Sequence, residues 1–170
     1  REGVAVKQMV KMEHHDTLGC FFLNHPPISQ FQVAVADAHP ITRGLPDSFT
    51  VQDELYMIEL QDPDATTPLF TTKLEKDPSP LGFGFVYDED TSVQEDGETR
   101  VLGYARTVGE GEIVYIVLGH CHVGRDGSPS PVDPSIDPDG KMPAEFHNVW
   151  QSDAFNRLLE NGIEWGLGAG

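Results

Sequence analysis

Two histidines follow directly after the most apolar stretch of the sequence. The run 113–118 (IVYIVL) continues into the letters GHCH, which place His120 and His122 two positions apart. In an extended backbone both imidazoles then point to the same side, a spacing that suits a first-row metal such as zinc if a carboxylate or a third imidazole completes the site. The candidates for that completing ligand are Asp53, Glu54 and His147.

Two alternatives stay open for metal binding. A histidine at the end of a strand often only hydrogen-bonds to nearby backbone, and His-x-His is common by chance. Calcium is a second possible divalent metal, because the runs 87–90 and 133–140 are rich in aspartate. These runs lack the glycine and terminal glutamate of an EF-hand loop, so a solvated loop is the simpler expectation for both.

The adjacent acids Asp53 and Glu54 are the other chemically interesting pair. Neighbouring residues of a strand face opposite sides, so only one of the two can enter a given site. If that residue is Glu54, it is suited to act as a general base, with His120 as the acid or as an orienting donor. Otherwise, Asp53 caps the preceding turn and Glu54 forms an ion pair with an arginine. The candidate arginines are Arg43 and Arg106.

These side chains must be positioned by strands and turns that the sequence pattern predicts. Strands are expected at 31–37, 52–60 and 66–74, a β-hairpin at 100–107 and 113–118, and a helix at 152–165. The proline-flanked segment 39–46 predicts a compact turn, and the proline- and aspartate-rich segment 123–146 a long loop. Because 113–118 is apolar on both faces, we expect it inside a parallel or mixed sheet, with His120 at the ligand-binding end.

Composition narrows the range of functions. The 170 residues suffice for one domain, spanning 1–170. With 11 basic against 28 acidic residues, the net charge of −17 makes nucleic acid an improbable partner. No apolar window reaches the roughly 18 residues of a membrane span, and the first residues do not resemble a signal peptide, so we expect a soluble chain of undetermined compartment. The two cysteines are too few for a disulfide scaffold, although a single bridge stays open.

Several segments, in this order, resemble the ThuA-like (trehalose utilisation) family. They are GCFFLNHPP, FQVAVAD, HPITRGLP, DELY, VYIVLGH and the pattern W-x-S-x-A-F-x-R-L-L-x-x-G-I-x-W between residues 150 and 165. The resemblance implies a flavodoxin-like α/β fold, a mixed sheet flanked by helices, as in the class I glutamine amidotransferase-like superfamily. Two departures are expected: the usual N-terminal βαβ half is missing, and 123–146 is an insertion.

The resemblance also implies a role in bacterial sugar metabolism, on a glycoside or an oxidised sugar of the trehalose type. The small-molecule sugar would sit in a crevice at the strand ends, where an isomerase or hydrolase-like reaction would take place. Glutaminase chemistry is not expected, because neither Cys20 nor Cys121 lies on a strand-to-helix elbow. The alternative is a non-catalytic module that binds carbohydrate or protein, with a homo-oligomer as one form of assembly.

The residues expected at that site have distinct roles. The catalytic candidates are His120, Glu54 and His39, and the substrate-binding candidates are Tyr56, Asp53, Arg43 and Trp150. A glutamate can accept a sugar hydroxyl, an arginine can hold an anionic group, and the flat face of a tryptophan can stack on a sugar ring. The simpler alternative for His39 is that it only fastens its own turn.

Overall fold

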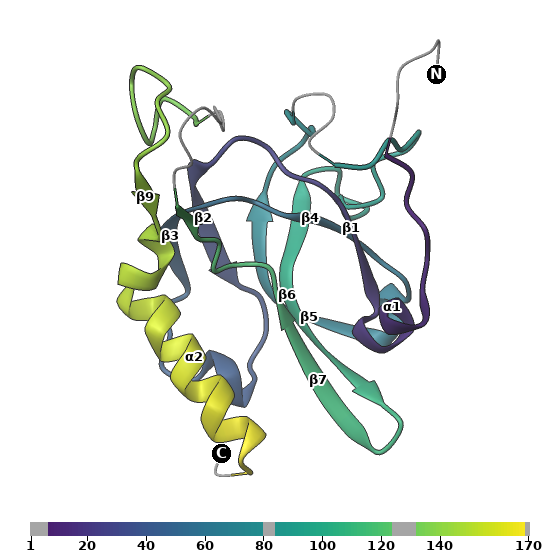
Figure 1. Cartoon of the computed structure of the whole chain (residues 1–170). Helices are drawn as coiled ribbons and strands as arrows, with labels where there is room; N and C mark the ends of the chain where they lie inside the picture. The colour runs from purple at the N-terminus through teal and green to yellow at the C-terminus, as the bar shows by residue number, and fades with distance from the viewer. Residues whose placement is uncertain (1–6, 80–83, 124–131, 169–170) are drawn as a thin grey trace.

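The centre of the protein is a five-stranded sheet in which every neighbouring pair is antiparallel. The computed structural model describes residues 7–79, 84–123 and 132–168. The sheet has the order β3-β2-β5-β6-β7 (Figure 1). Its strands are β2 (Ser29–Val35), β3 (Ser48–Asp53), β5 (Thr66–Lys73), β6 (Thr99–Val108) and β7 (Gly111–Ile116).

The expected flavodoxin-like α/β fold is therefore wrong. Parallel strands require crossover connections of a dozen or more residues, usually helical, whereas β6 and β7 are joined by a turn of only Gly109 and Glu110. The described residues contain two α-helices, α1 (Glu13–Leu18) and α2 (Asp153–Gly166), and neither connects two strands of the sheet. Consecutive strands accordingly fold back on one another, as an antiparallel protein requires.

The predicted strand 52–60 is interrupted at the acidic pair. The chain leaves the main sheet after Asp53, and Met57–Leu60 forms β4, which pairs with β1 (Cys20–Asn24) in a separate antiparallel ribbon. Residues Glu54–Tyr56 lie between the two strands. The predicted strand 52–60 is therefore not continuous, and Glu54 lies just beyond the carboxyl end of β3.

The predicted hairpin is confirmed, but its apolar arm lies at the edge of the sheet. β7 pairs with β6 alone, and Ile113–Ile116 are half-buried instead of enclosed on both faces. The sheet curls strongly, because the two edge strands β3 and β7 meet at their carboxyl ends: the Asp53 carboxylate accepts a hydrogen bond from the Gly119 backbone N–H at 2.7 Å. The apolar side chains of 114–118 instead pack toward the core on the concave side of the curled sheet.

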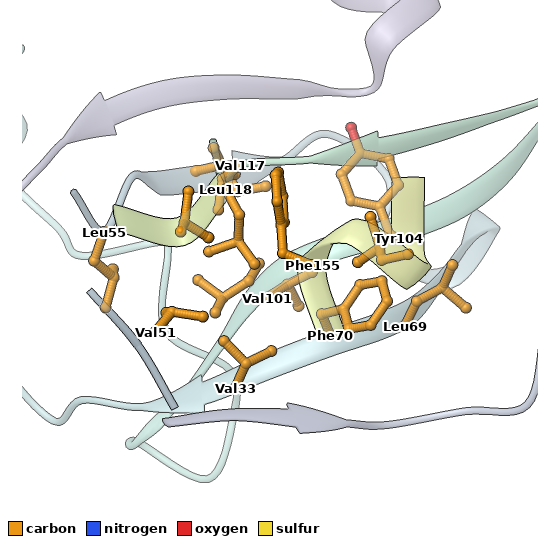
Figure 2. Close-up of a cluster of buried hydrophobic side chains, with 14 of the residues drawn as sticks. Val33, Val51, Leu55, Leu69, Phe70, Val101, Tyr104, Val117, Leu118 and Phe155 are labelled. Atoms are coloured by element: carbon orange, nitrogen blue, oxygen red, sulfur yellow. The ribbon is translucent and has the colours of Figure 1, made fainter. Parts of the chain in front are cut away.

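The larger of two buried clusters in the described residues fills the curled sheet. Figure 2 shows Val33, Val101, Val117 and Phe155 converging in it, so that strands and the C-terminal helix contribute to one core. The helix α2 begins as predicted, since the Ser152 hydroxyl accepts a hydrogen bond from the Phe155 backbone N–H. Its Phe155 and Leu158 are buried, whereas Ile163 is 65% exposed. The ribbon β1–β4 joins the core through buried Cys20, Met57 and Ile58.

The remaining segments are short. The predicted turn contains the 3₁₀ helix η1 (Pro40–Thr42), and two further 3₁₀ helices, η2 (Pro63–Ala65) and η3 (Asn148–Gln151), precede β5 and α2. The segment 123–146 is bounded by a two-residue ribbon of β8 (His122–Val123) and β9 (Glu145–Phe146), and its residues 124–131 lie outside the described part. Among the described residues, no helix has the length and apolar character needed to cross a membrane.

Candidate functional site

Three imidazoles surround the Glu54 carboxylate. The Nδ1 atom of His120 lies 2.8 Å from Glu54 Oε2, and the Nδ1 atom of His25 lies 2.9 Å from Oε1. The Nε2 atom of His122 lies 3.8 Å from Oε1. Strands β1 and β3 end directly before His25 and Glu54, whereas β7 ends at Ile116, so a short segment leads from it to His120. His122 begins β8. We call Glu54, His25, His120 and His122 the Glu54 cluster.

Asp53 connects the two chain segments that carry Glu54 and His120. It is completely buried, and its two oxygens accept the backbone N–H groups of Gly119 at 2.7 Å, His120 at 3.1 Å and Glu54 at 2.9 Å. Three backbone donors satisfy this carboxylate in the low-dielectric interior, where an unpaired charge would be costly. Asp53 thus links the segment after β7 to the end of β3 and brings His120 against Glu54.

The electrostatics of the cluster are dominated by burial and by the Glu54–histidine contacts. Burial alone raises the pKa of Glu54, but hydrogen bonds from His120 and His25 outweigh it and lower the pKa to about 2. The same Glu54 contact raises the pKa of His120. Burial, together with the charge of His120, lowers the pKa of His122. Glu54 is therefore an anion at neutral pH, His120 retains a proton readily, and His122 favours its neutral form.

Aromatic side chains border the cluster. The Tyr56 ring packs against both His120 and His25, at centroid distances of 5.4 and 5.6 Å, and its burial and the Glu54 charge raise its pKa to about 12. Trp150 is 43% exposed and donates its indole N–H to the Gly119 carbonyl at 3.1 Å. Both aromatic residues expected at the site are therefore close to His120, Tyr56 by ring contact and Trp150 through its neighbour Gly119.

Three other candidates are not part of the Glu54 cluster. The ring of His39 accepts the Ile41 N–H, which caps η1, and its Nε2 lies 3.8 Å from a carboxylate oxygen of Glu112. Arg43, a substrate-binding candidate, forms an exposed ion pair with Glu164, 2.9 Å long, and the alternative pairing of Arg43 with Glu54 is not formed. His147 is exposed and lies outside the group of potential metal ligands. All three lie outside β3 and β7, whose ends converge only because the sheet curls.

His25 is the cluster member that sequence reasoning missed. A signal for it existed, because the apolar run Cys20–Leu23 ends in an asparagine and a histidine before two prolines. This is the same pattern of an apolar strand that stops on histidine that singled out His120. The contact partner could not be foreseen, since it depends on β1 pairing with β4 outside the main sheet.

The cluster has the donor atoms and the dimensions of a metal site. The ligand atoms of Glu54, His120 and His122 all lie within 4.8 Å of one another. Metal–ligand bonds near 2.0–2.1 Å in a tetrahedral zinc site place neighbouring ligand atoms roughly 3.3 Å apart. The observed separations from Glu54 to His120 and to His122, 2.8 and 3.8 Å, bracket that value. The Nε2 atom of His122 is moreover buried without a hydrogen-bond partner.

The fold and the site define a mainly antiparallel β-protein with a buried carboxylate and several imidazoles at its strand ends. More particularly, the chain belongs to the ThuA family, whose model, described as trehalose utilisation, matches residues 3–123. That range contains every member of the Glu54 cluster. Neither the curated proteins nor the solved structures contain a significant match to the chain.

Proposed function

We propose that this ThuA-family chain acts in trehalose-type sugar metabolism, on a glycoside or an oxidised sugar, at the Glu54 cluster. The observation that carries the proposal is the convergence of three imidazoles on one buried carboxylate, within the matched range 3–123. Buried ionisable groups with shifted pKa values at a common point are typical of reactive sites.

The first candidate chemistry is proton transfer at a sugar oxygen or an adjacent carbon. With a pKa of about 2, Glu54 is a weak base, and it serves better by orienting His120 and stabilising its protonated form. His120, 20% exposed at its side chain, is the group that reaches substrate and donates or accepts the proton. This differs from the sequence-based hypothesis, in which Glu54 is the general base and His120 the acid or an orienting donor.

Turnover of trehalose-type and keto-glycoside substrates tests this role. We expect His120→Ala to lower kcat by at least about 100-fold, the usual contribution of a general acid or base. The matched control is His147→Ala, which removes an exposed imidazole outside the cluster and should leave kcat unchanged. Equal activity of wild type and His120→Ala would remove His120 from the mechanism.

The second candidate is that the cluster binds a divalent metal through Glu54, His120 and His122. One observation favours it specifically: the buried Nε2 atom of His122 has no hydrogen-bond partner, and a bound metal would satisfy it. Imidazole donors favour zinc over calcium, which prefers a shell of oxygen ligands. A bound zinc ion would polarise a sugar oxygen as a Lewis acid.

Zinc titration by calorimetry separates the two candidates. If the cluster is a metal site, wild type and His147→Ala bind one equivalent of zinc with the same affinity, and His122→Ala binds at least tenfold more weakly. Unchanged zinc affinity in His122→Ala would exclude this ligand set. Turnover in the presence of a strong chelator would in turn show that the reaction proceeds by proton transfer alone.

A further inference from the structure

A concave pocket formed by described residues lies beside the Glu54 cluster and contains none of its members. β2 pairs with β5 only through Ala34–Thr71 and Val35–Phe70, so the two strands separate toward Ser29. A pocket of about 690 Å³ occupies the space between them and is lined by residues of both strands. This volume lies within the range of small-molecule sites, 300–1,000 Å³.

The pocket adjoins the cluster through the chain itself. Its wall includes Pro26 and Leu55, the residues that directly follow His25 and Glu54. A ligand in the pocket therefore lies against the same two chain segments that carry the imidazole and the carboxylate. Such a position suits the part of a substrate that is remote from the reacting atoms.

The polar groups that line the pocket are mostly uncharged. Gln30 and Gln32 lie on the face of β2 opposite the completely buried Val33, and Thr71 contributes from β5. Prolines and Leu74 supply apolar surface to the same pocket. Amide and hydroxyl groups beside apolar surface are what a sugar ring needs, because each ring presents hydroxyls at its rim and C–H groups on its faces.

The lining offers little to an anionic ligand. Its cationic side chain, Lys73, has its ammonium group within 3.0 Å of Asp96 and 2.8 Å of Glu98, which offset its charge. Asp133 adds a carboxylate to the wall. The chain as a whole carries a net charge of −17. A phosphate group brought into this pocket would meet repulsion and no available cation.

We infer that this pocket binds one ring of a neutral glycoside and discriminates against the corresponding sugar phosphate. The inference rests on the proposed function, since it assigns the substrate class to the same site. It places recognition in the gap between β2 and β5, while the reaction takes place at the Glu54 cluster. The ligand is thus an uncharged glycoside, of which one ring occupies the pocket.

Calorimetric titration with trehalose and with trehalose 6-phosphate tests the inference. We expect trehalose to bind and its phosphate to bind at least about fivefold more weakly at low salt, the factor that corresponds to about 1 kcal/mol of repulsion. Salt should reduce this difference, since it screens the charges. Equal or tighter binding of the phosphate, or no binding of trehalose, would overturn the inference.

Two glutamine variants locate the binding. Gln32→Ala removes an amide from the pocket, and we expect trehalose to bind roughly fivefold more weakly for the loss of one hydrogen bond. Gln61→Ala is the matched control: each amide donates one exposed hydrogen bond, to Ser48 or to Asp16, but Gln61 does not line the pocket. Unchanged affinity in Gln32→Ala, with an unchanged thermal melting curve, would place any trehalose elsewhere.

Glu54→Gln distinguishes failure of this inference from failure of the proposed function. This variant alters the cluster and leaves the pocket lining intact, so trehalose should bind as to wild type while turnover is lost. Loss of turnover with retained binding supports both proposals. Retained turnover would contradict the proposed function, and a variant that melts like wild type but has lost trehalose binding would contradict the separate pocket.

Discussion

Replacement of Asp53 by asparagine tests whether this buried carboxylate closes the sheet. The three backbone N–H groups that it accepts come from Glu54, Gly119 and His120, at 2.9, 2.7 and 3.1 Å. Asparagine preserves the shape but replaces one acceptor oxygen by an NH₂ group, which would point its hydrogens at a backbone donor. At least one buried N–H then loses its acceptor.

The expected cost follows from these contacts. A buried donor left without a partner costs about 1–3 kcal/mol, and the bonds that remain lose the strengthening provided by a charged acceptor. We therefore expect Asp53→Asn to lower the free energy of unfolding by roughly 2–4 kcal/mol. This is a large fraction of the 5–15 kcal/mol typical of a domain.

Urea denaturation followed by circular dichroism at neutral pH measures this change. The control is Asp47→Asn, an exposed aspartate just before the start of β3, for which we expect a change within about 0.5 kcal/mol. A similarly small effect of Asp53→Asn would refute the reasoning. Burial raises the pKa of Asp53, although the hydrogen bonds from the backbone act in the opposite direction. Asparagine closely mimics a protonated carboxyl group. A null result would therefore fit a protonated Asp53 and would contradict closure of the sheet by a charged carboxylate.

Three further predictions concern other parts of the molecule. Burial opposes ionisation of Asp90, but hydrogen bonds from Arg100 and Ser92 outweigh burial and lower the pKa of Asp90. The stability that ionised Asp90 contributes is therefore present above its unfolded-state pKa of 3.8 and is lost as pH falls through its folded-state pKa. Urea denaturation should show that Asp90→Asn lowers the free energy of unfolding by roughly 2–3 kcal/mol at neutral pH, less than for a fully buried ion pair because Asp90 is partly exposed. Below about pH 4 the variant should lose less further stability than the wild type. Gly103→Ala would place a methyl carbon 2.8 Å from the Phe70 ring, so thermal melting should reveal a loss of about 1–3 kcal/mol, and an unchanged melting temperature would contradict the packing in the core. His39→Ala removes the η1 cap and should cost about 0.5–1.5 kcal/mol without changing kcat; a fall in kcat like that of His120→Ala would restore His39 to the site.

Local sequence patterns correctly predicted most individual elements. The hairpin of β6 and β7, the strand β5, the turn at 39–46 and the start of α2 depend on residues close in the chain, such as the glycine turn at 109 and the Ser152 cap. The family assignment likewise followed from ordered local segments. The interruption of the strand 52–60 was not predicted, because its alternation continues through the point where the chain moves to another ribbon.

The sequence by itself therefore determined the family, the strand-forming segments and three of the cluster residues, Glu54, His120 and His122. Only the tertiary structure decided that the strands run antiparallel, that β7 is an edge, and that His25 joins the cluster while His39 and Arg43 do not. The physical reason is that periodicity reports which face of a segment is apolar, whereas strand order and curl depend on packing between distant segments. The cluster forms where that curl brings the ends of β3 and β7 together, and Asp53 makes the hydrogen bonds that hold them there.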